Sequence, residues 1–411
     1  MNALNQHHLR SFIQQLAANI RNYYDLKEGL IPLHAPCFND KEKQKVVATI
    51  DSTFVSSVGE EVQRFEQQVA DFVGAPYGVA LVNGTAGLML ALRLVGVQQN
   101  DLVLTQSLTF VATANAITQL CATPLFIDVD RQTLGMSAQA LQDYLATQTQ
   151  IKAGQCYHKA TGQRIAACMP MHTLGMPCEI EQIVTICQAY QIPVVEDAAE
   201  SLGSKVNGRH TGTWGQVGVF SFNGNKILTT GGGGVLVTAQ KTLAQQAKHL
   251  STTAKQPHPW AFEHDAIGYN LRLPNLNAAL GVAQMQKLST FLHQKQQLHK
   301  NYQIWIQKKA ANLPKSPAPL QNLEILKAPK GTEPNYWLNG LLLPDRQNRD
   351  FWLETLNQLQ IQARPLWKPL HQQAIYQAAP HQELTNTDWL AERIINLPSG
   401  IPCHKFFKKS E

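Results

Sequence analysis

Between Val46 and Gly281, short apolar runs alternate with segments that carry apolar residues at helical spacing. The apolar runs predict buried strands, and the segments between them predict amphipathic helices. This alternation is typical of βαβ units, so we expect an α/β fold with a mostly parallel central sheet flanked by helices. The predicted strands are Gly78–Val82, Leu102–Thr105, Thr123–Asp128, Ile165–Met169 and Pro193–Glu196, and the predicted helices are Ala86–Leu94, Thr109–Gln119, Ala138–Ala146 and Ile180–Tyr190.

The pattern changes beyond residue 216. Val217–Phe222 and Gly234–Val237 predict two strands separated by a polar, glycine-rich segment, which favours a local hairpin-like pairing. A long helical stretch follows from Leu276 to about Lys309, and the Pro-rich segment Leu313–Pro319 is predicted to be a linker.

The two ends of the chain complete the organisation. At the N-terminus, residues Leu9 to Tyr24 predict a helix with one apolar face, and near the C-terminus a strand at Leu338–Leu343 precedes a helix near Arg349–Leu359. A chain of 411 residues is longer than a single domain with one hydrophobic core usually is. We therefore predict a helical extension over 1–30, a large domain over 31–285 and a smaller α+β domain over 286–411.

Composition restricts the class of protein. Hydrophobic residues make up 44% and charged residues 16%, which is typical of a soluble globular chain. The net charge of +6 suits a small anionic substrate, but no basic stripe indicates nucleic acid, and Lys405, Lys408 and Lys409 are interpreted as a solvated tail. No apolar stretch reaches the length of a membrane span, and the N-terminus lacks a secretory signal, so we expect a cytoplasmic protein.

The seven cysteines indicate reduced thiols. Their number is odd and no Cys-x-x-Cys pair occurs, so we expect neither a disulfide framework nor a zinc site. Cys168, His172 and Cys178 are close in sequence, but their spacing matches no familiar set of metal ligands.

Candidate chemistry begins where the strand Pro193–Glu196 ends in acids. In parallel α/β sheets, ligands bind beyond the carboxyl ends of the strands, which places Asp197 to meet one. An anion at this position can pair with the protonated pyridine nitrogen of pyridoxal phosphate and keep the cofactor an electron sink. The alternative is that Asp197 or Glu196 caps a following helix.

A second candidate is Lys226, which lies between predicted strands and precedes four glycines. Burying an ammonium is costly unless it is paired, whereas an amine of lowered pKa can attack the cofactor aldehyde to form a Schiff base. Ser221, five residues earlier, can bind a phosphate through its hydroxyl. The alternative is an exposed loop lysine beside a glycine-rich turn.

Two weaker signals precede these. Asn83-Gly84-Thr85-Ala86-Gly87 follows an apolar run and opens a helix, and such an N-terminus offers free N–H groups to a phosphate. The alternative is an ordinary N-cap by Asn83 or Thr85. Phe110 can stack on a pyridine ring or, alternatively, pack in the core.

The order of these elements is the strongest observation: phosphate-binding turn, aromatic residue, strand-end aspartate, then serine and lysine before glycines. In this order the chain resembles the fold-type I pyridoxal-phosphate enzymes and, more narrowly, the sugar-nucleotide aminotransferases of the DegT–StrS group. The resemblance covers roughly Pro32 to Gly400. The segments that carry it are Asn83–Leu90, Thr109–Ala116, Val194–Gly203, Val219–Gly234 and Gly268–Leu280.

The resemblance implies a role for each candidate. Lys226 would hold pyridoxal 5'-phosphate covalently and move the proton between cofactor and substrate carbons, and Asp197 would pair with the pyridine nitrogen. Glu200 would lie near the phenolic oxygen of the cofactor, although relatives often carry Gln or His there. Phe110 would cover one face of the ring. The phosphate would be held by Gly84, Thr85, Ala86 and Ser221.

The resemblance also implies partners. Asn270, in Gly268-Tyr269-Asn270, would reach the cofactor phosphate of a neighbouring subunit, which implies a homodimer with shared sites; in a monomer it would only cap a helix. Arg364 falls in a region near the substrate mouth, where it would suit a diphosphate or carboxylate unless it is a plain surface arginine. His172 is the second candidate substrate contact, because Met171–Gly175, like Tyr157–Gly162 and the N-terminal extension, matches one branch of the family.

That branch aminates 4-keto-6-deoxy-2-acetamido sugars on routes to legionaminic-acid-type or bacillosamine-type sugars. We therefore expect transfer of an amino group, with glutamate as donor, to C4 of a nucleotide-linked keto sugar, through a pyridoxamine 5'-phosphate form and with ping-pong kinetics. C3 amination is the alternative. A sugar dehydratase of this fold would carry His in place of Lys226, and a non-catalytic sensor would not need both Asp197 and Lys226.

Overall fold

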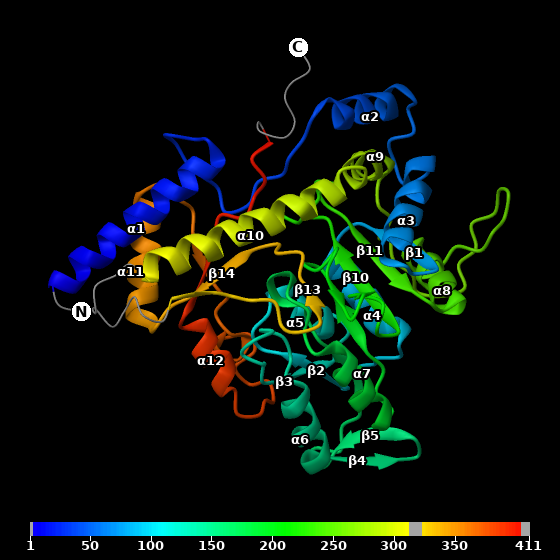
Figure 1. The fold of residues 1–411 in the computed structure, drawn as a ribbon. Helices are drawn as coiled ribbons and strands as arrows, with labels where there is room; N and C mark the ends of the chain where they lie inside the picture. The colour runs from blue at the N-terminus through cyan, green and yellow to red at the C-terminus, as the bar shows by residue number, and fades with distance from the viewer. Residues whose placement is uncertain (1–2, 312–322, 404–411) are drawn as a thin grey trace.

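The structure is a computed structural model that describes residues 3–311 and 323–403. The predicted linker Leu313–Pro319 and the predicted C-terminal lysine tail lie outside the described residues. Figure 1 shows a large α/β body around one sheet, with a smaller unit formed by both ends of the described chain. No described helix has the length and apolar character needed to cross a membrane.

The central sheet has the strand order β1-β11-β10-β7-β6-β2-β3. The strands β1-β11-β10-β7 and the strands β6-β2-β3 join through a parallel bridge between Cys168, in β6, and Val194, which precedes β7. Only β11 runs antiparallel to its neighbours, β1 and β10. The bounds are β1 (Tyr77–Leu81), β2 (Leu102–Gln106), β3 (Thr123–Ile127), β6 (Ile165–Met169), β7 (Val195–Asp197), β10 (Val217–Ser221) and β11 (Gly234–Thr238). The predicted strands, the mostly parallel sheet and the β10–β11 pairing are thus confirmed.

Helices bury both faces of this sheet, which explains why its strands are apolar along their whole length. On β10, Val219 packs into the core beneath α4, whereas Phe220 packs on the opposite face with α3 and α9. The helices of the large body are α2 (Asp40–Asp51), α3 (Glu60–Val73), α4 (Gly84–Leu94), α5 (Val111–Thr118), α6 (Ala138–Gln148), α7 (Ile180–Ala189), α8 (Lys241–Ser251) and α9 (Asn275–Met285). Two small sheets are attached to this body, β4 (Thr149–Lys152) with β5 (Gln155–His158), and β13 (Thr332–Glu333) with β8 (Lys205–Val206) and β9 (Arg209–His210).

The predicted long helix after Leu276 is two helices. The first, α9, ends at Met285, and α10 (Leu288–Ala311) begins three residues later. Lys287 lies at this break, where its buried ammonium pairs with Glu42 of α2. Periodicity alone did not predict the interruption, because both helices remain apolar on one side.

The smaller unit contains an antiparallel sheet in the order β12-β14-β16-β15. The N-terminal helix α1 (Ala3–Tyr24) belongs to the same core, because its apolar face, including Phe12 and Leu16, packs with Trp352 of α11 and Tyr302 of α10. Figure 1 shows α1 beside α11, although the two are far apart in sequence. The remaining bounds are α11 (Arg346–Gln358), α12 (Thr385–Ala391), β12 (Glu324–Ile325), β14 (Asn339–Leu342), β15 (Arg364–Pro365) and β16 (Ile394–Leu397).

One expectation about the cysteines was wrong. Cys37 and Cys403 form a disulfide across 366 residues of sequence. The fold brings the segment before α2 beside the C-terminal segment, with the two Cα atoms 5.6 Å apart, and no local spacing could have shown this. The other five cysteines are free thiols.

Candidate active site

Three of the predicted site residues lie at the carboxyl ends of the central strands. Asp197 is the last residue of β7, Ser221 is the last residue of β10, and Lys226 follows five residues later in the loop that leads to β11. Strand β7 and β10 are parallel neighbours, so Asp197 and the loop bearing Lys226 emerge at the same edge. Ligands of α/β sheets bind at this edge, as the sequence predicted.

Lys226 lies between a carboxylate and an indole. Its Nζ is 3.2 Å from Oε1 of Glu200 and 4.2 Å from the ring centroid of Trp337. Its side chain is only 12% exposed. The alternative of an exposed loop lysine is therefore wrong, and the amine, largely shielded from solvent, is held by an ion pair and a cation–π contact.

Glu200 is buried and its two oxygens have different partners. Oε1 faces Lys226, while Oε2 accepts a hydrogen bond of 2.9 Å from the backbone N–H of Leu174. Burial raises the pKa of the Glu200 carboxyl to about 7, against the opposing effect of Lys226. The acid thus titrates near neutral pH, where it can exchange a proton with a neighbouring group.

Asp197 is buried, with a relative exposure of 2%. Its Oδ2 accepts a hydrogen bond of 2.8 Å from the Thr113 hydroxyl, and Oδ1 accepts one of 3.2 Å from the Ala199 N–H. Burial raises the pKa of this carboxyl, whereas Thr113, Ala199 and Lys226 act in the opposite direction. The strand is followed by a turn rather than a helix, so the alternative of a helix cap does not hold.

The predicted phosphate-binding turn lies against the end of β10. A Cβ added at Gly84 would lie 3.0 Å from Cβ of Ser221, so the absence of a side chain at Gly84 favours this close approach of the α4 N-terminus to the serine. Asn83 caps the helix by accepting the Ala86 N–H at 2.8 Å. Ala86 therefore already has a partner, which leaves the hydroxyl of Ser221 and the first-turn backbone N–H groups at Gly84 and Thr85 as the better phosphate donors.

Phe110 and Arg364 are both exposed to solvent. Phe110 is 49% exposed, and its ring centroid is 6.4 Å from that of Trp367. Arg364 is exposed on β15, two residues before Leu366. The alternative that Phe110 packs in the core does not hold, because half of its side chain faces solvent.

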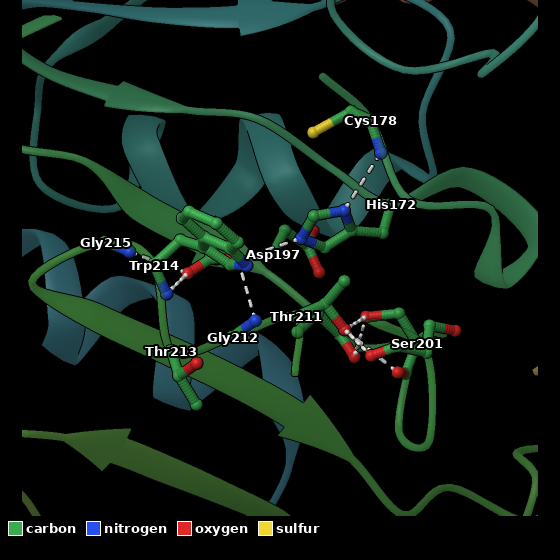
Figure 2. Close-up of polar contacts among 12 residues, drawn as sticks. His172, Cys178, Asp197, Ser201, Thr211, Gly212, Thr213, Trp214 and Gly215 are labelled. Carbon is green, nitrogen blue, oxygen red and sulfur yellow. Dashed lines mark hydrogen bonds and ion pairs between the residues drawn. The ribbon is translucent and has the colours of Figure 1, made fainter. Parts of the chain in front are cut away.

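His172 has a different environment from the one expected. It is fully buried, its Nε2 lies 3.0 Å from Glu196, and its Nδ1 accepts the Cys178 N–H at 3.2 Å (Figure 2). These bonds assign the proton to Nε2. Glu196 also accepts backbone N–H groups from Gly212, Trp214 and Gly215. Both ring nitrogens of His172 are therefore used inside the protein, and the geometry favours support of strand β7 over the substrate contact that we expected.

Asn270 is exposed on the surface of the chain. Its side-chain oxygen accepts a hydrogen bond of 3.1 Å from the Arg272 side chain. The backbone of Arg272 forms an antiparallel bridge with Leu81, the last residue of β1. The asparagine thus lies at the edge of the sheet beyond β1, with its side chain available to a neighbouring molecule.

These residues fit pyridoxal phosphate. A shielded amine, a buried carboxylate one strand away and a serine facing a helix N-terminus match the aldehyde, the pyridine nitrogen and the phosphate of the cofactor. When bound, the cofactor supplies an electron sink that stabilises negative charge on a substrate carbon.

Sequence reasoning missed Trp337, Asn335 and the role of Thr113. Asn335 donates to the backbone oxygens of Glu200 and Leu202 at 2.8 and 2.9 Å, and so fixes the loop that carries Glu200. Trp337 and Asn335 lie far from Lys226 in the sequence, so no motif joins them to it. The tripeptide Asn335-Tyr336-Trp337 in front of an apolar strand was the only local signal.

Comparisons with known proteins identify the family of the chain. The profile of the DegT/DnrJ/EryC1/StrS aminotransferase family matches residues 36–403, and the chain belongs to this family. It is a pyridoxal-phosphate-dependent sugar aminotransferase of fold type I, as the sequence indicated.

Three relatives illustrate the similarity. The chain is 34% identical to a GDP-perosamine synthase of Escherichia coli O157:H7, over 90% of this chain and 93% of that protein. It is 34% identical to the putative pyridoxal phosphate-dependent aminotransferase EpsN of Bacillus subtilis (strain 168), over 90% and 91%. The crystal structure of DesI with its TDP-sugar product aligns with a TM-score of 0.77 at 25% identity, over 90% of this chain and 88% of that one.

Proposed function

We propose that the protein transfers an amino group from glutamate to C4 of a nucleotide-linked 4-keto-6-deoxy sugar, with a 2-acetamido sugar as the favoured substrate. The observation that carries the proposal is the placement of the Lys226 amine, 3.2 Å from Glu200 at the strand edge that also bears Asp197. An amine with an acid partner beside a buried carboxylate can move a proton to and from a substrate carbon, which is the central step of amino transfer.

Each residue has a defined task in this proposal. Lys226 takes the proton from the donor carbon and later delivers it to the sugar carbon. Glu200, whose pKa of about 7 lets it hold or release a proton near neutral pH, keeps the amine oriented toward the reacting side. Asp197, held by Thr113, would supply the negative charge that pairs with the pyridine nitrogen. Ser221 and the N-terminus of α4 would hold the phosphate and so orient the cofactor.

The relatives support a nucleotide-linked substrate. Their names include GDP-perosamine synthase, and DesI was crystallised with a TDP-sugar product. The N-terminal helix and the segment Met171–Gly175 support the branch that aminates 2-acetamido sugars for surface polysaccharides or nonulosonic acids. In this proposal Arg364, which is exposed on β15, pairs with the diphosphate of such a substrate.

We also propose a homodimer in which each site is completed by its partner. Asn270 is exposed and lies beyond β1, the edge strand that β11 separates from β10, and β10 is the strand that leads into the Lys226 loop of the same chain. Exposed apolar side chains include Phe54 and Val58, in the segment before α3, and Trp260, Phe262 and Ile267, in the segment that precedes Asn270. Apolar surface of this kind is typical of a face that another protein covers.

The test is a substrate panel. The cofactor-loaded protein is incubated with glutamate and with 4-keto-6-deoxy sugars, with and without the 2-acetamido group, on UDP, GDP and TDP. We expect 2-oxoglutarate with at least one of them, and NMR of the amino sugar assigns C4. Amination at C3 would replace the positional assignment, and an absence of 2-oxoglutarate with every sugar would reject the proposal.

A spectrum separates the enzyme from the competing readings. We expect a visible absorbance band that borohydride fixes on Lys226 and that glutamate removes. A band that glutamate leaves unchanged would favour a cofactor-binding sensor. Dehydration of the sugar without transfer of nitrogen would favour a sugar dehydratase, a reading that Lys226 already opposes.

A further inference from the structure

A second lysine, Lys295 of α10, is buried near the site and has no role in the proposed reaction. Its exposure is 1%, and its ammonium donates to the Trp337 backbone oxygen at 3.0 Å, to that of Ser399 at 2.7 Å and to Nε2 of His34 at 2.9 Å. The three acceptors use all three N–H donors. All of them are neutral, because burial together with the two lysines lowers the pKa of His34 well below its usual range.

Such a site is costly to build. An ammonium without a carboxylate partner loses its hydration, and burial lowers the pKa of Lys295 to about 7. A methionine or leucine would fill the same space without this cost. The contacts show what the amine provides instead. It hydrogen-bonds to His34, Trp337 and Ser399, and so joins three chain segments that are far apart in sequence.

Trp337 in turn contacts Lys226 on its other side. Its ring lies under the Lys226 ammonium, with 4.2 Å between Nζ and the ring centroid, and its Nε1 donates to the backbone oxygen of Asn225 at 2.7 Å. The Trp337 N–H donates to Asn335, which also binds the backbone of Glu200. The indole is thus tied to the residue before Lys226 and to the loop of its acid partner.

We propose that Lys295 is a positioning residue for Lys226 and that it acts through Trp337, which it fixes as the surface on which the ammonium rests. The inference rests on the proposed function only in that Lys226 is the working amine. Lys295 touches neither Lys226 nor Glu200 by any of its three hydrogen bonds, so its effect passes through the Trp337 backbone. It therefore sets the place of the amine without entering the chemistry.

A purely structural role for Lys295 makes a different prediction. In that case its loss would lower stability and leave Lys226 unchanged. Lys287 offers a matched control, because it is also buried at the start of the same helical region but pairs with Glu42 and the backbone of Cys37, away from Trp337. A comparison of K295M with K287M thus separates general destabilisation from a local effect.

The experiment measures Lys226 in the protein without cofactor. Acetic anhydride labels only the uncharged amine, so the pH midpoint of labelling at Lys226, read by peptide mass spectrometry, reports its ionisation. A cation–π contact favours the ammonium, and its loss is expected to lower the midpoint in W337L by about 0.4 to 1.5 pH units. K295M is expected to lower the labelling midpoint of Lys226 in the same direction but by a smaller amount. The midpoint of W337F should lie between those of wild type and W337L. K287M should leave the midpoint unchanged.

Two further measurements complete the test. In the loaded enzyme, K295M and W337L should lower kcat about tenfold with a smaller change in KM for glutamate, and should raise the isotope effect with glutamate deuterated at Cα, because a misplaced amine slows proton transfer. Should K295M fail to fold, K295Q, which keeps a polar side chain in the same space, takes its place in both measurements. Midpoints that coincide with wild type in W337L and K295M overturn the inference, whatever reaction the enzyme catalyses, since labelling needs neither cofactor nor sugar.

Discussion

The amine of Lys226 and the carboxylate of Glu200 lie 3.2 Å apart, and the carboxylate is almost completely buried. Burial raises the pKa of Glu200 from 4.5 to about 7, so the native protein holds this proton more tightly than the unfolded chain does. The resulting stability is complete below pH 4.5 and is lost as the pH rises through 7. The loss is at most roughly 3 kcal/mol.

Glu200→Gln is expected to remove this dependence. Between pH 4.5 and 7, urea unfolding of the cofactor-free protein should show the variant gaining stability relative to wild type. We also expect the variant to retain activity, since a glutamine oxygen can still accept from Lys226, with a weaker pH dependence of kcat/KM near 7. Parallel stability curves for the two proteins would show that Glu200 does not titrate in this range.

Asp197 and its hydroxyl partner allow a graded test of the pyridine-nitrogen contact. Asp197→Asn removes the charge and should lower kcat/KM for glutamate roughly 100-fold, whereas Thr113→Val removes one hydrogen bond and should cost about fivefold. Because Thr113 opposes the raised pKa of Asp197, its loss raises that pKa further, and the T113V defect should be larger at low pH.

The measurement is the rate at which glutamate removes the visible absorbance band, taken between pH 5.5 and 8.5. Cofactor content, determined after denaturation, serves as the control for binding. An Asp197→Asn variant with wild-type rates would remove Asp197 from the site.

The elements that sequence predicted best are those whose signal is local. Strand β10 is apolar on both faces because helices cover both, and Asp197 follows an apolar strand whose end faces ligands in any sheet of this kind. Trp337 illustrates the opposite case. It reaches Lys226 only because the smaller unit folds back on the large one. The two residues are 111 positions apart in the sequence, and no periodic pattern over that distance would reveal their contact.

Side-chain environment was equally hard to predict. The sequence around His172 suggested a substrate contact. In the structure, its imidazole is instead a hydrogen-bond partner of the fully buried Glu196 side chain. The disulfide between Cys37 and Cys403 depends on the meeting of two terminal segments, which no spacing rule describes.

The phosphate turn depends on a glycine that can be tested directly. A Cβ at Gly234 would lie 2.8 Å from the Asn83 carbonyl, so Gly234→Ala must push the N-terminus of α4 away from β11. Overpacking of this size typically costs 1–3 kcal/mol, and we expect cofactor affinity to fall about 10- to 100-fold. Gly224→Ala is the control, because its Cβ would meet nothing within 4 Å.

Equilibrium titration of the two variants with pyridoxal phosphate, followed by absorbance, makes the comparison. Equal affinities for Gly234→Ala and Gly224→Ala would place the phosphate elsewhere. A fall in cofactor affinity for Gly234→Ala, with a loss of unfolding free energy no larger than about 1–3 kcal/mol in urea, would locate the effect at the turn rather than in the sheet as a whole.

Asn270 tests whether active sites are shared between subunits. Its side chain is exposed and binds only Arg272 among the contacts that the structure gives it, so Asn270→Asp, which brings a negative charge to the partner's phosphate, should reduce activity strongly without unfolding the chain. Lys226→Ala should abolish turnover in its own site. When the two inactive variants are mixed under conditions that exchange subunits, half of the molecules become hybrids in which one of two sites is intact, and activity should recover to about a quarter of wild type. No recovery, in a mixture shown by mass spectrometry to contain hybrids, would mean that Asn270 serves the site of its own chain.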